Sequence, residues 1–255
     1  MDLARELKVA REAARRGGEL ALSYQRKGVR PETKADDSPV TVADREAEKL
    51  IVSILLEAFP NDGLLGEEGS GREAHDGRRW IIDPIDGTRD FSRGSPLWAV
   101  LVALEANGEV VAGVVSIPGW EREYYAARGA GAWCNENRIH VSGMCDASQA
   151  VLYFNGLREA HRREFGPRLV EFMSRFWAVR SMSGALDAML VAAGNGDVWV
   201  EPAAQPWDLA ALQVIAEEAG GRFFNFDGGR SIYAGNCVVC APGMEPEVRR
   251  FLNGN

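Results

Sequence analysis

The sequence predicts an α/β fold with a layered architecture. Segments whose apolar residues recur at helical spacing alternate with short runs of β-branched and aromatic residues, in both halves of the chain. With 255 residues, 46% of them hydrophobic and 26% charged, the chain can bury a substantial core. We therefore expect one domain with two lobes, of about residues 1–140 and 141–255, in which helices cover sheets.

Two helices are expected at the start. Apolar residues at helical intervals predict an amphipathic helix from residue 2 to about residue 27, and Gly17-Gly18 weakens its middle. A polar stretch over residues 34–44, interrupted by Pro39, leads into a second helix from about Thr41 to Phe59.

A sheet follows in the first half. Trp80, Ile81 and Ile82 form a short apolar run typical of a buried strand. Two more runs, residues 98–104 and 110–117, are separated by the hairpin signal Ala106-Asn-Gly-Glu109. Residues 122–127 and 131–134 continue the sheet.

The second half alternates strands and helices. We expect strands over residues 150–154, 197–201, 222–226 and 237–240, and helices over residues 159–176, 183–193, 206–219 and 245–252. Pro206 suits the first turn of its helix, and Gly220-Gly221 suits its end.

The stretch from Trp80 to Thr88 holds the strongest functional signal. It reads Trp-Ile-Ile-Asp83-Pro-Ile-Asp86-Gly87-Thr88, so that two carboxylates follow a buried strand. A short helix beginning at Gly87-Thr88 would offer free backbone N–H groups to an anion. Such a combination suits Mg²⁺, which binds a few carboxylates together with substrate oxygens.

Further acids stand at the ends of elements, near Gly, Pro or Thr. The full set is Asp44, Glu67, Asp83, Asp86, Glu201 and Asp208. Clustered carboxylates repel one another unless cations neutralise them, so a metal site would use these acids together. Each also has a structural alternative: Asp-Pro and Asp-Gly are turn formers, Thr41 and Asp44 suit a helix start, and Glu67-Glu68 between glycines suits a solvated turn.

Several function classes lose support. The net charge of −8 disfavours nucleic-acid binding, and the absence of an 18-residue apolar window disfavours a membrane protein, so we expect a cytoplasmic location. Cys237 and Cys240 have redox spacing, but their apolar surroundings favour a buried strand. The chain contains no phosphate-binding GxxxxGK[ST] loop and no GxSxG elbow.

Five motifs in order resemble the inositol monophosphatase family of Mg²⁺-dependent, lithium-sensitive phosphatases. They are SPVTVADREAE, GEEGS, WIIDPIDGT, PWDLAAL and EEAGG, and they extend over nearly the whole chain. The resemblance implies a single phosphatase domain with an αβαβα sandwich, usually paired as a homodimer. It also implies phosphomonoester hydrolysis by an activated water molecule, without a Cys or His nucleophile.

The resemblance assigns roles to individual residues. Glu67, Asp83 and the carbonyl of Ile85 would hold one Mg²⁺, and Asp83, Asp86 and Asp208 a second; Glu67 would also reach a third ion. Gly87 and Thr88 would bind phosphate through their backbone N–H groups. The Thr88 hydroxyl and Asp44 would orient the attacking water, with Glu67 as a further catalytic residue.

Substrate contacts resemble those of the histidinol-phosphate phosphatases in this family. Arg89 after the DGT motif, the stretch from Asp36 to Arg45 and the Glu201-Pro202 pair before Asp208 carry this resemblance. It implies a cationic leaving alcohol with the acid Glu201 beside it. That subgroup often has Gly-Asp where this chain has Ser183-Gly184, so we expect Ser183 and Asp187 to serve instead. Inositol 1-phosphate or another sugar or nucleotide phosphate is the alternative substrate, and a non-catalytic metal-binding regulator is the alternative class.

Overall fold

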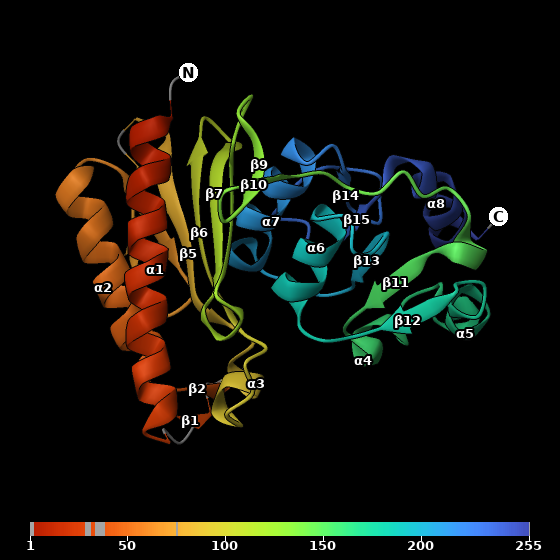
Figure 1. The fold of residues 1–255 in the computed structure, drawn as a ribbon, viewed down its shortest axis with the longest axis horizontal. Helices are drawn as coiled ribbons and strands as arrows, with labels where there is room; N and C mark the ends of the chain where they lie inside the picture. Colours follow the sequence, from red (N-terminus) through yellow and green to blue (C-terminus); the bar gives the residue numbers. More distant parts are fainter. Residues whose placement is uncertain (1–2, 29–31, 34–38, 75, 255) are drawn as a thin grey trace.

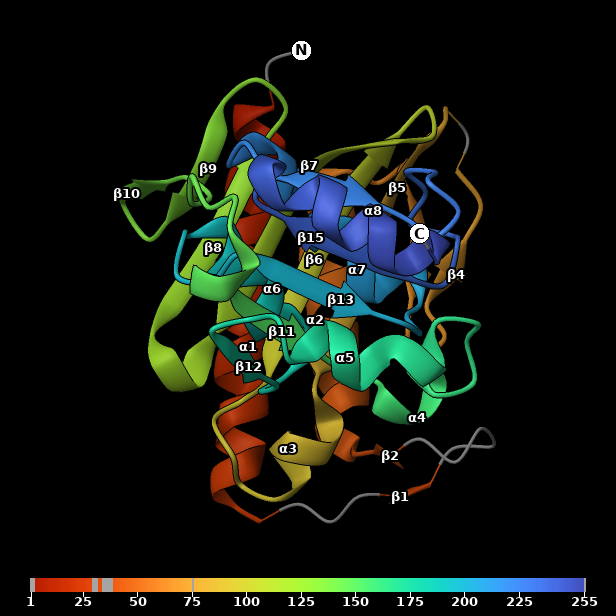
Figure 2. The ribbon, with the colours of Figure 1, turned by 90° about the vertical axis from the view of Figure 1, so that its right-hand side faces the viewer.

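The protein is built from five alternating layers of helices and sheets (Figures 1 and 2). The computed structural model describes residues 3–28, 32–33, 39–74 and 76–254. From one side to the other the layers are α1 with α2, an eight-stranded sheet, α6 with α7, a five-stranded sheet, and an outer layer with α4, α5 and α8. The predicted αβαβα arrangement is confirmed.

The first layer consists of α1 (Ala4–Arg26) and α2 (Val42–Ala58). α1 is continuous, and its two central glycines have a packing role. A Cβ atom on Gly17 would lie 2.7 Å from Ile51 Cδ1, and one on Gly18 would lie 2.8 Å from Pro118 Cγ. Glycine therefore lets α1 approach its neighbours closely. Glycine has a low helix propensity, but the close packing of α1 compensates for this loss of stability.

Two short strands, β1 (Glu32–Thr33) and β2 (Pro39–Val40), pair between these helices. Residues 34–38 of the predicted polar stretch lie outside the described residues.

The eight-stranded sheet has the order β10-β9-β8-β7-β6-β5-β3-β4. Its strands are β3 (Gly63–Gly66), β4 (Gly71–Arg72), β5 (Arg78–Asp86), β6 (Ala99–Ala106), β7 (Glu109–Ile117), β8 (Arg122–Ala127), β9 (Gly131–Cys134) and β10 (Asn137–Ile139). β3 and β5 are parallel, and the other pairs are antiparallel. Because successive side chains of a strand face opposite ways, Trp80 and Ile82 pack toward α1 and α2 while Ile81 packs toward α7.

The middle layer, α6 (Gly184–Ala192) and α7 (Pro206–Glu218), packs against the other face of this sheet. α7 lies so close to β7 that a Cβ atom on Gly113 would stand 2.9 Å from Ala211 Cα. A single cluster of buried residues extends from this sheet through both helices to the second sheet.

The second sheet has the order β12-β11-β13-β15-β14. Its strands are β11 (Val151–Phe154), β12 (Ala178–Arg180), β13 (Val198–Glu201), β14 (Arg222–Phe224) and β15 (Cys237–Cys240). β11 is parallel to both β12 and β13, and β15 is antiparallel to β13 and β14. The outer helices α4 (Leu157–Ala160), α5 (Leu169–Met173) and α8 (Glu245–Asn253) cover its far face.

The predicted helix over residues 159–176 is wrong. The chain forms α4, an irregular turn, a 3₁₀ turn at Gly166–Arg168 and then α5. Pro167 lacks an N–H group and disfavours helical backbone at Gly166, so the helix stops and restarts there. Strand β12, which follows α5, was not predicted.

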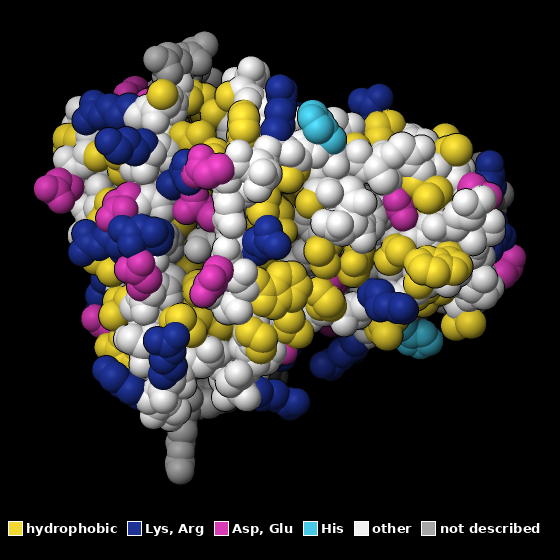
Figure 3. All heavy atoms as spheres, viewed as in Figure 1, with side chains coloured by type: hydrophobic (Ala, Val, Ile, Leu, Met, Phe, Trp, Pro, Cys, Tyr) yellow, Lys and Arg dark blue, Asp and Glu magenta, His cyan; other side chains and the backbone are white. Residues whose placement is uncertain are grey.

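The surface mixes charges of both signs. In Figure 3, Lys and Arg side chains alternate with Asp and Glu over the helix α1, where Arg15 pairs with Glu12 at 2.7 Å and with Glu19 at 2.5 Å. Within the described part of the chain, no helix has the length and apolar character needed to cross a membrane.

Candidate metal centre and its cavity

The first part of the site is the irregular end of β5. The strand continues through Pro84 to Asp86, beyond the predicted end, with a shift of register against β6 between Asp83 and Asp86. Proline is tolerated at such irregular positions because no ladder N–H is needed there. Asp83 is 1% exposed, and its Oδ1 accepts a hydrogen bond of 2.9 Å from the Ile85 N–H.

The chain then turns at Gly87 into the short helix α3 (Thr88–Ser92). Gly87 has φ = 90°, and a Cβ atom there would lie 2.9 Å from the Leu97 carbonyl oxygen. Only glycine suits both the left-handed backbone and this close approach. The predicted helix start at Gly87-Thr88 is confirmed.

Asp208 comes from the first turn of α7. Its carboxylate accepts a 2.7 Å hydrogen bond from the Gln205 N–H, as in a capping box, and Pro206 occupies the first turn. This cap fixes the side chain at the helix start, beside the end of β5.

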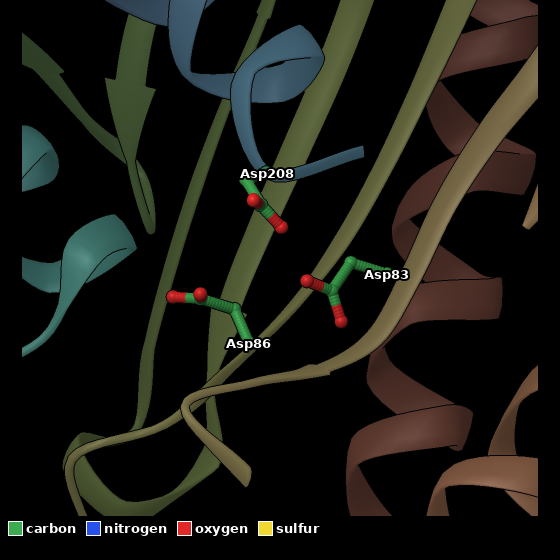
Figure 4. Close-up of side chains that lie close together, drawn as sticks. All are labelled: Asp83, Asp86 and Asp208. Atoms are coloured by element: carbon green, nitrogen blue, oxygen red, sulfur yellow. The ribbon is translucent and has the colours of Figure 1, made fainter. Parts of the chain in front are cut away.

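Asp83, Asp86 and Asp208 converge. Each offers one carboxylate oxygen, and these oxygens lie within 4.8 Å of one another; Figure 4 shows the three side chains at one spot, two from β5 and one from α7. These three acids, which are distant in sequence, therefore lie together as expected. These three acids, found among the residues that the structure describes, offer oxygen atoms of the kind that hard divalent cations prefer as ligands.

Burial and mutual repulsion raise the pKa values of all three acids. Burial raises the pKa of Asp86 to about 6, and burial together with the Asp86 charge raises the pKa of Asp208 to about 7. Asp83 has its pKa raised well above the ordinary value, first by burial and then by Glu67. Cations would relieve this repulsion, so the donor set fits a metal.

Glu67 reaches the cluster from the loop between β3 and β4. Its backbone N–H donates to the Ile82 carbonyl at 3.1 Å, which ties the loop to β5. Its negative charge contributes to the raised pKa values of Asp83, Asp86 and Asp208, so Glu67 lies near all three.

Asp44 and Thr88 meet next to the Ile85 carbonyl. Asp44 is 0% exposed, and its Oδ2 accepts hydrogen bonds from the Thr41 N–H at 2.8 Å and the Thr41 hydroxyl at 2.6 Å. The Thr88 hydroxyl lies 3.3 Å from Asp44 Oδ1 and 3.1 Å from the Ile85 carbonyl oxygen. Thr41 and Asp44 thus form a cap at the start of α2, which is the structural alternative given above for these two residues. Asp44 contacts Thr88 as well.

A cavity of about 470 Å³ opens onto the cluster. The predicted residues that line it are Glu67, Asp86, Gly87, Thr88, Arg89, Ser183, Glu201 and Asp208. A larger cavity, of about 770 Å³, contains the ion pair of Arg79 with Glu105 (2.6 Å) instead of a carboxylate cluster. The smaller cavity is the candidate site, because acids of the carboxylate cluster line it.

The predicted substrate residues occupy different places. Glu201 lines the cavity, and burial raises its pKa to about 8. Asp187 does not line it: this side chain is 0% exposed, its Oδ2 accepts a 3.0 Å bond from the Met182 N–H, and its buried Oδ1 has no hydrogen-bond partner. Burial raises the pKa of Asp187 to about 6.

The residues of the cavity wall that were not predicted from the sequence include Asn155 and Trp199. Asn155 lines the cavity and accepts a 2.7 Å hydrogen bond from Trp199 Nε1. Asn155 directly follows β11, so the signal used for Asp83, a polar residue just after a buried strand, could have found it.

The cysteines are free. Cys237 and Cys240 are buried in β15, as predicted, and Cys134 is also buried while Cys145 is exposed.

The chain matches the inositol monophosphatase family over residues 2–251. It is 39% identical over 237 residues to a histidinol-phosphatase of Chlorobaculum parvum, covering 92% of each chain. It is also 40% identical over 211 residues to an inositol-1-monophosphatase of Mesorhizobium japonicum, covering 78% of this chain and 79% of the relative. A solved structure of an IMPase from Thermotoga maritima is similar with a TM-score of 0.90 and 32% identity, covering 98% of this chain and 97% of that one.

Proposed function

Because this chain belongs to the inositol monophosphatase family and is a phosphoric monoester hydrolase, we propose that it hydrolyses L-histidinol phosphate to histidinol. The observation that carries the proposal is the cavity lined both by acids of the carboxylate cluster and by a further, partly exposed acid, Glu201. The cluster suits cations and a phosphate group, and Glu201 suits a positively charged alcohol.

We propose that Mg²⁺ occupies the cluster as two or three ions. Glu67, Asp83 and the Ile85 carbonyl would hold one, Asp83, Asp86 and Asp208 a second, and Glu67 would reach a third. When bound, the ions neutralise phosphate oxygens, favour ionisation of water and stabilise the leaving alkoxide. The Thr88 hydroxyl has one proton and two acceptors within reach, the Ile85 carbonyl and Asp44. When the proton goes to Asp44, the Ile85 carbonyl keeps both lone pairs and can serve as a ligand.

Asp44 and Thr88 would orient the attacking water. Two hydrogen bonds from Thr41 fix the Asp44 carboxylate, which leaves its other oxygen facing Thr88. If the Thr88 hydroxyl donates its proton to Asp44, its oxygen can accept a proton of the water and turn a water lone pair toward phosphorus. The backbone N–H groups of Gly87 and Thr88, at the start of α3, would bind phosphate oxygens.

Glu201 and Ser183 would recognise the alcohol. An ammonium or imidazolium group in the cavity would favour the ionised form of Glu201 and so offset the cost of its burial. Asp187 would add negative charge behind the wall without touching the substrate, since it is fully buried. Gly184 borders the cluster directly, because a Cβ atom on it would be in ordinary contact with the Asp86 oxygens at 3.8 Å.

A substrate panel tests the proposal. We expect kcat/KM for histidinol phosphate to exceed the values for inositol 1-phosphate, fructose 1,6-bisphosphate and adenosine 3′,5′-bisphosphate. A higher value for inositol 1-phosphate would favour the second candidate, which the identity to the inositol-1-monophosphatase supports. Protein that binds Mg²⁺ but releases no phosphate from any of these esters would point to a non-catalytic regulator.

We propose further that residues 1–255 form a single phosphatase domain with lobes meeting near residue 140, and that it works as a cytoplasmic homodimer. The shared core between the two sheets supports one domain, and the four free cysteines agree with a reducing compartment. Light scattering coupled to gel filtration tests the dimer.

A further inference from the structure

Glu48 is a buried acid that the proposed reaction does not use. It lies on α2 one turn after Asp44 and is 2% exposed. Since residues four apart share a helix face, α2 directs both acids toward the same side. Asp44 reaches Thr88, and Glu48 reaches the loop that carries Glu67.

Both oxygens of Glu48 bind that loop. Oε2 accepts the Glu68 N–H at 2.8 Å, and Oε1 accepts the Ser70 N–H at 2.9 Å. Hydrogen bonds from backbone N–H groups to a buried carboxylate are among the stronger ones in proteins, because one partner is charged. The two bonds hold the residues that follow Glu67.

Gly66 makes room for this contact. A Cβ atom on Gly66 would lie 2.5 Å from Glu48 Oε2, so a larger residue would displace the carboxylate. The Gly66 N–H donates to the Ser70 carbonyl at 2.8 Å and the Glu67 N–H donates to Ile82 at 3.1 Å. The loop is thus closed on itself, tied to β5 and held by Glu48 on α2.

We propose that Glu48 is a positioning residue that holds the Glu67 loop in its metal-binding conformation. Without a cation, the negative charges of Asp83, Asp86 and Asp208 repel Glu67, and the adjacent glycines give the loop freedom to move away. Glu48 opposes this movement by fixing the backbone on the far side of Glu67. The inference rests on the proposed function in one respect, the role of Glu67 as a metal ligand.

The first test compares Glu48→Ala and Glu48→Gln with Glu46→Ala. Glu46 is the matched control, because it lies on the same helix with an exposed side chain paired to Lys49. In metal-free protein, Glu48→Ala should speed hydrogen exchange of the Glu68 and Ser70 amides by about tenfold or more. It should also raise the Mg²⁺ dissociation constant, measured by calorimetry, by about 10- to 100-fold, as loss of supporting partners does at other metal sites.

The kinetic pattern separates positioning from general stability. At saturating Mg²⁺ we expect the KM of Glu48→Ala for its substrate to stay within about twofold of wild type. The amide exchange rates and the Mg²⁺ dissociation constant of Glu48→Gln should lie between those of the wild type and Glu48→Ala, since the Gln amide oxygen can still accept one N–H. Unchanged amide exchange and unchanged Mg²⁺ affinity in Glu48→Ala would overturn the inference.

A second variant gives an independent test. Gly66→Ala should reproduce the effects of Glu48→Ala, because its methyl group takes the place of the carboxylate. In the double variant the two effects should not add, since the displaced group is already gone. Additive effects of Gly66→Ala and Glu48→Ala would contradict the inference. If Glu48→Ala does not fold, Gly66→Ala alone is compared with the wild type, and unchanged amide exchange together with unchanged Mg²⁺ affinity would contradict the inference.

Failure of the proposed function looks different. It would appear in the wild-type protein as absent Mg²⁺-dependent phosphate release, while amide exchange still reports whether Glu48 holds the loop.

Discussion

The Thr88 hydroxyl lies 3.3 Å from Asp44 Oδ1, although 44 positions separate the two residues. Thr88 stands at the start of α3, after the irregular end of β5, whereas Asp44 stands in the first turn of α2. Their contact joins the helical layer to the candidate metal centre. It also fixes the position of the Thr88 hydroxyl at the wall of the cavity.

Removal of this hydroxyl should slow the chemical step. We expect Thr88→Ala to lower kcat by about 10²- to 10⁴-fold with little change in KM, because orientation of the water matters in the transition state. Thr88→Ser keeps a hydroxyl and should recover most of the loss. Steady-state kinetics with both variants checks this, and a Thr88→Ala enzyme with normal kcat would exclude the assigned role.

Neutralising one acid of the cluster should weaken metal binding without unfolding the protein. In Asp208→Asn and Asp86→Asn, an amide oxygen can still accept the bonds from the Gln205 and Ala185 N–H groups. We expect Mg²⁺ affinity to drop by about 10²-fold or more, with activity nearly lost.

The exposed Glu136 provides a matched control for these two variants, since its side chain is 87% exposed. Glu136→Gln should behave as wild type. Calorimetric Mg²⁺ titration measures the effect, and wild-type affinity in Asp208→Asn would show that this acid is not a ligand.

The metal-free protein should lose stability as the pH rises. Asp86 and Asp208 have pKa values of about 6 and about 7 in the folded chain, above the value of about 4 expected when unfolded. Between these values the folded state binds more protons, so the free energy of unfolding falls as the pH rises through them. We expect a loss of roughly 2–4 kcal/mol, or several degrees in Tm, between pH 5 and pH 8 in EDTA.

Mg²⁺ should reverse this trend, because it binds the ionised carboxylates and must displace protons at low pH. Thermal melts with and without Mg²⁺ should therefore show a larger gain at pH 8 than at pH 5. An equal gain at both values would argue against metal binding by these acids.

Glu201 should determine the preference for cationic substrates. Glu201→Gln keeps the size of the side chain but removes its charge, so we expect KM for histidinol phosphate to rise by about 10-fold or more. KM for the uncharged alcohol of inositol 1-phosphate should change by less than about threefold. An equal change in KM for both substrates would show that Glu201 does not recognise the charge of the substrate.

The packing of α7 should tolerate no added methyl group at Gly113. A Cβ atom there would lie 2.7 Å from Val214 Cγ1 and 2.9 Å from Ala211 Cα, so Gly113→Ala must push α7 from the sheet. We expect a loss of about 1–3 kcal/mol in the free energy of unfolding. Gly143→Ala, which meets no atom within 4 Å, should be nearly neutral in the same urea titration.

The sequence by itself determined most of the elements and the chemical type of the site. Apolar spacing predicted α1, α2, α7 and the strands β5 to β9, because local periodicity follows directly from the geometry of helix and strand. The failure at residues 159–176 has a local cause too, the proline at 167, whose effect outweighed the helical spacing.

Only the tertiary structure decided which acids meet. Asp208 lies far along the chain from Asp83, and no local pattern distinguishes an acid that faces a shared cavity from one that faces solvent. The same holds for Asp187, which was expected to contact the substrate and lies buried. It also holds for Glu48, whose contact with the Glu67 loop no local pattern indicates. The reason is physical: the position of a side chain relative to distant residues depends on how the layers pack, and packing is a property of the whole chain.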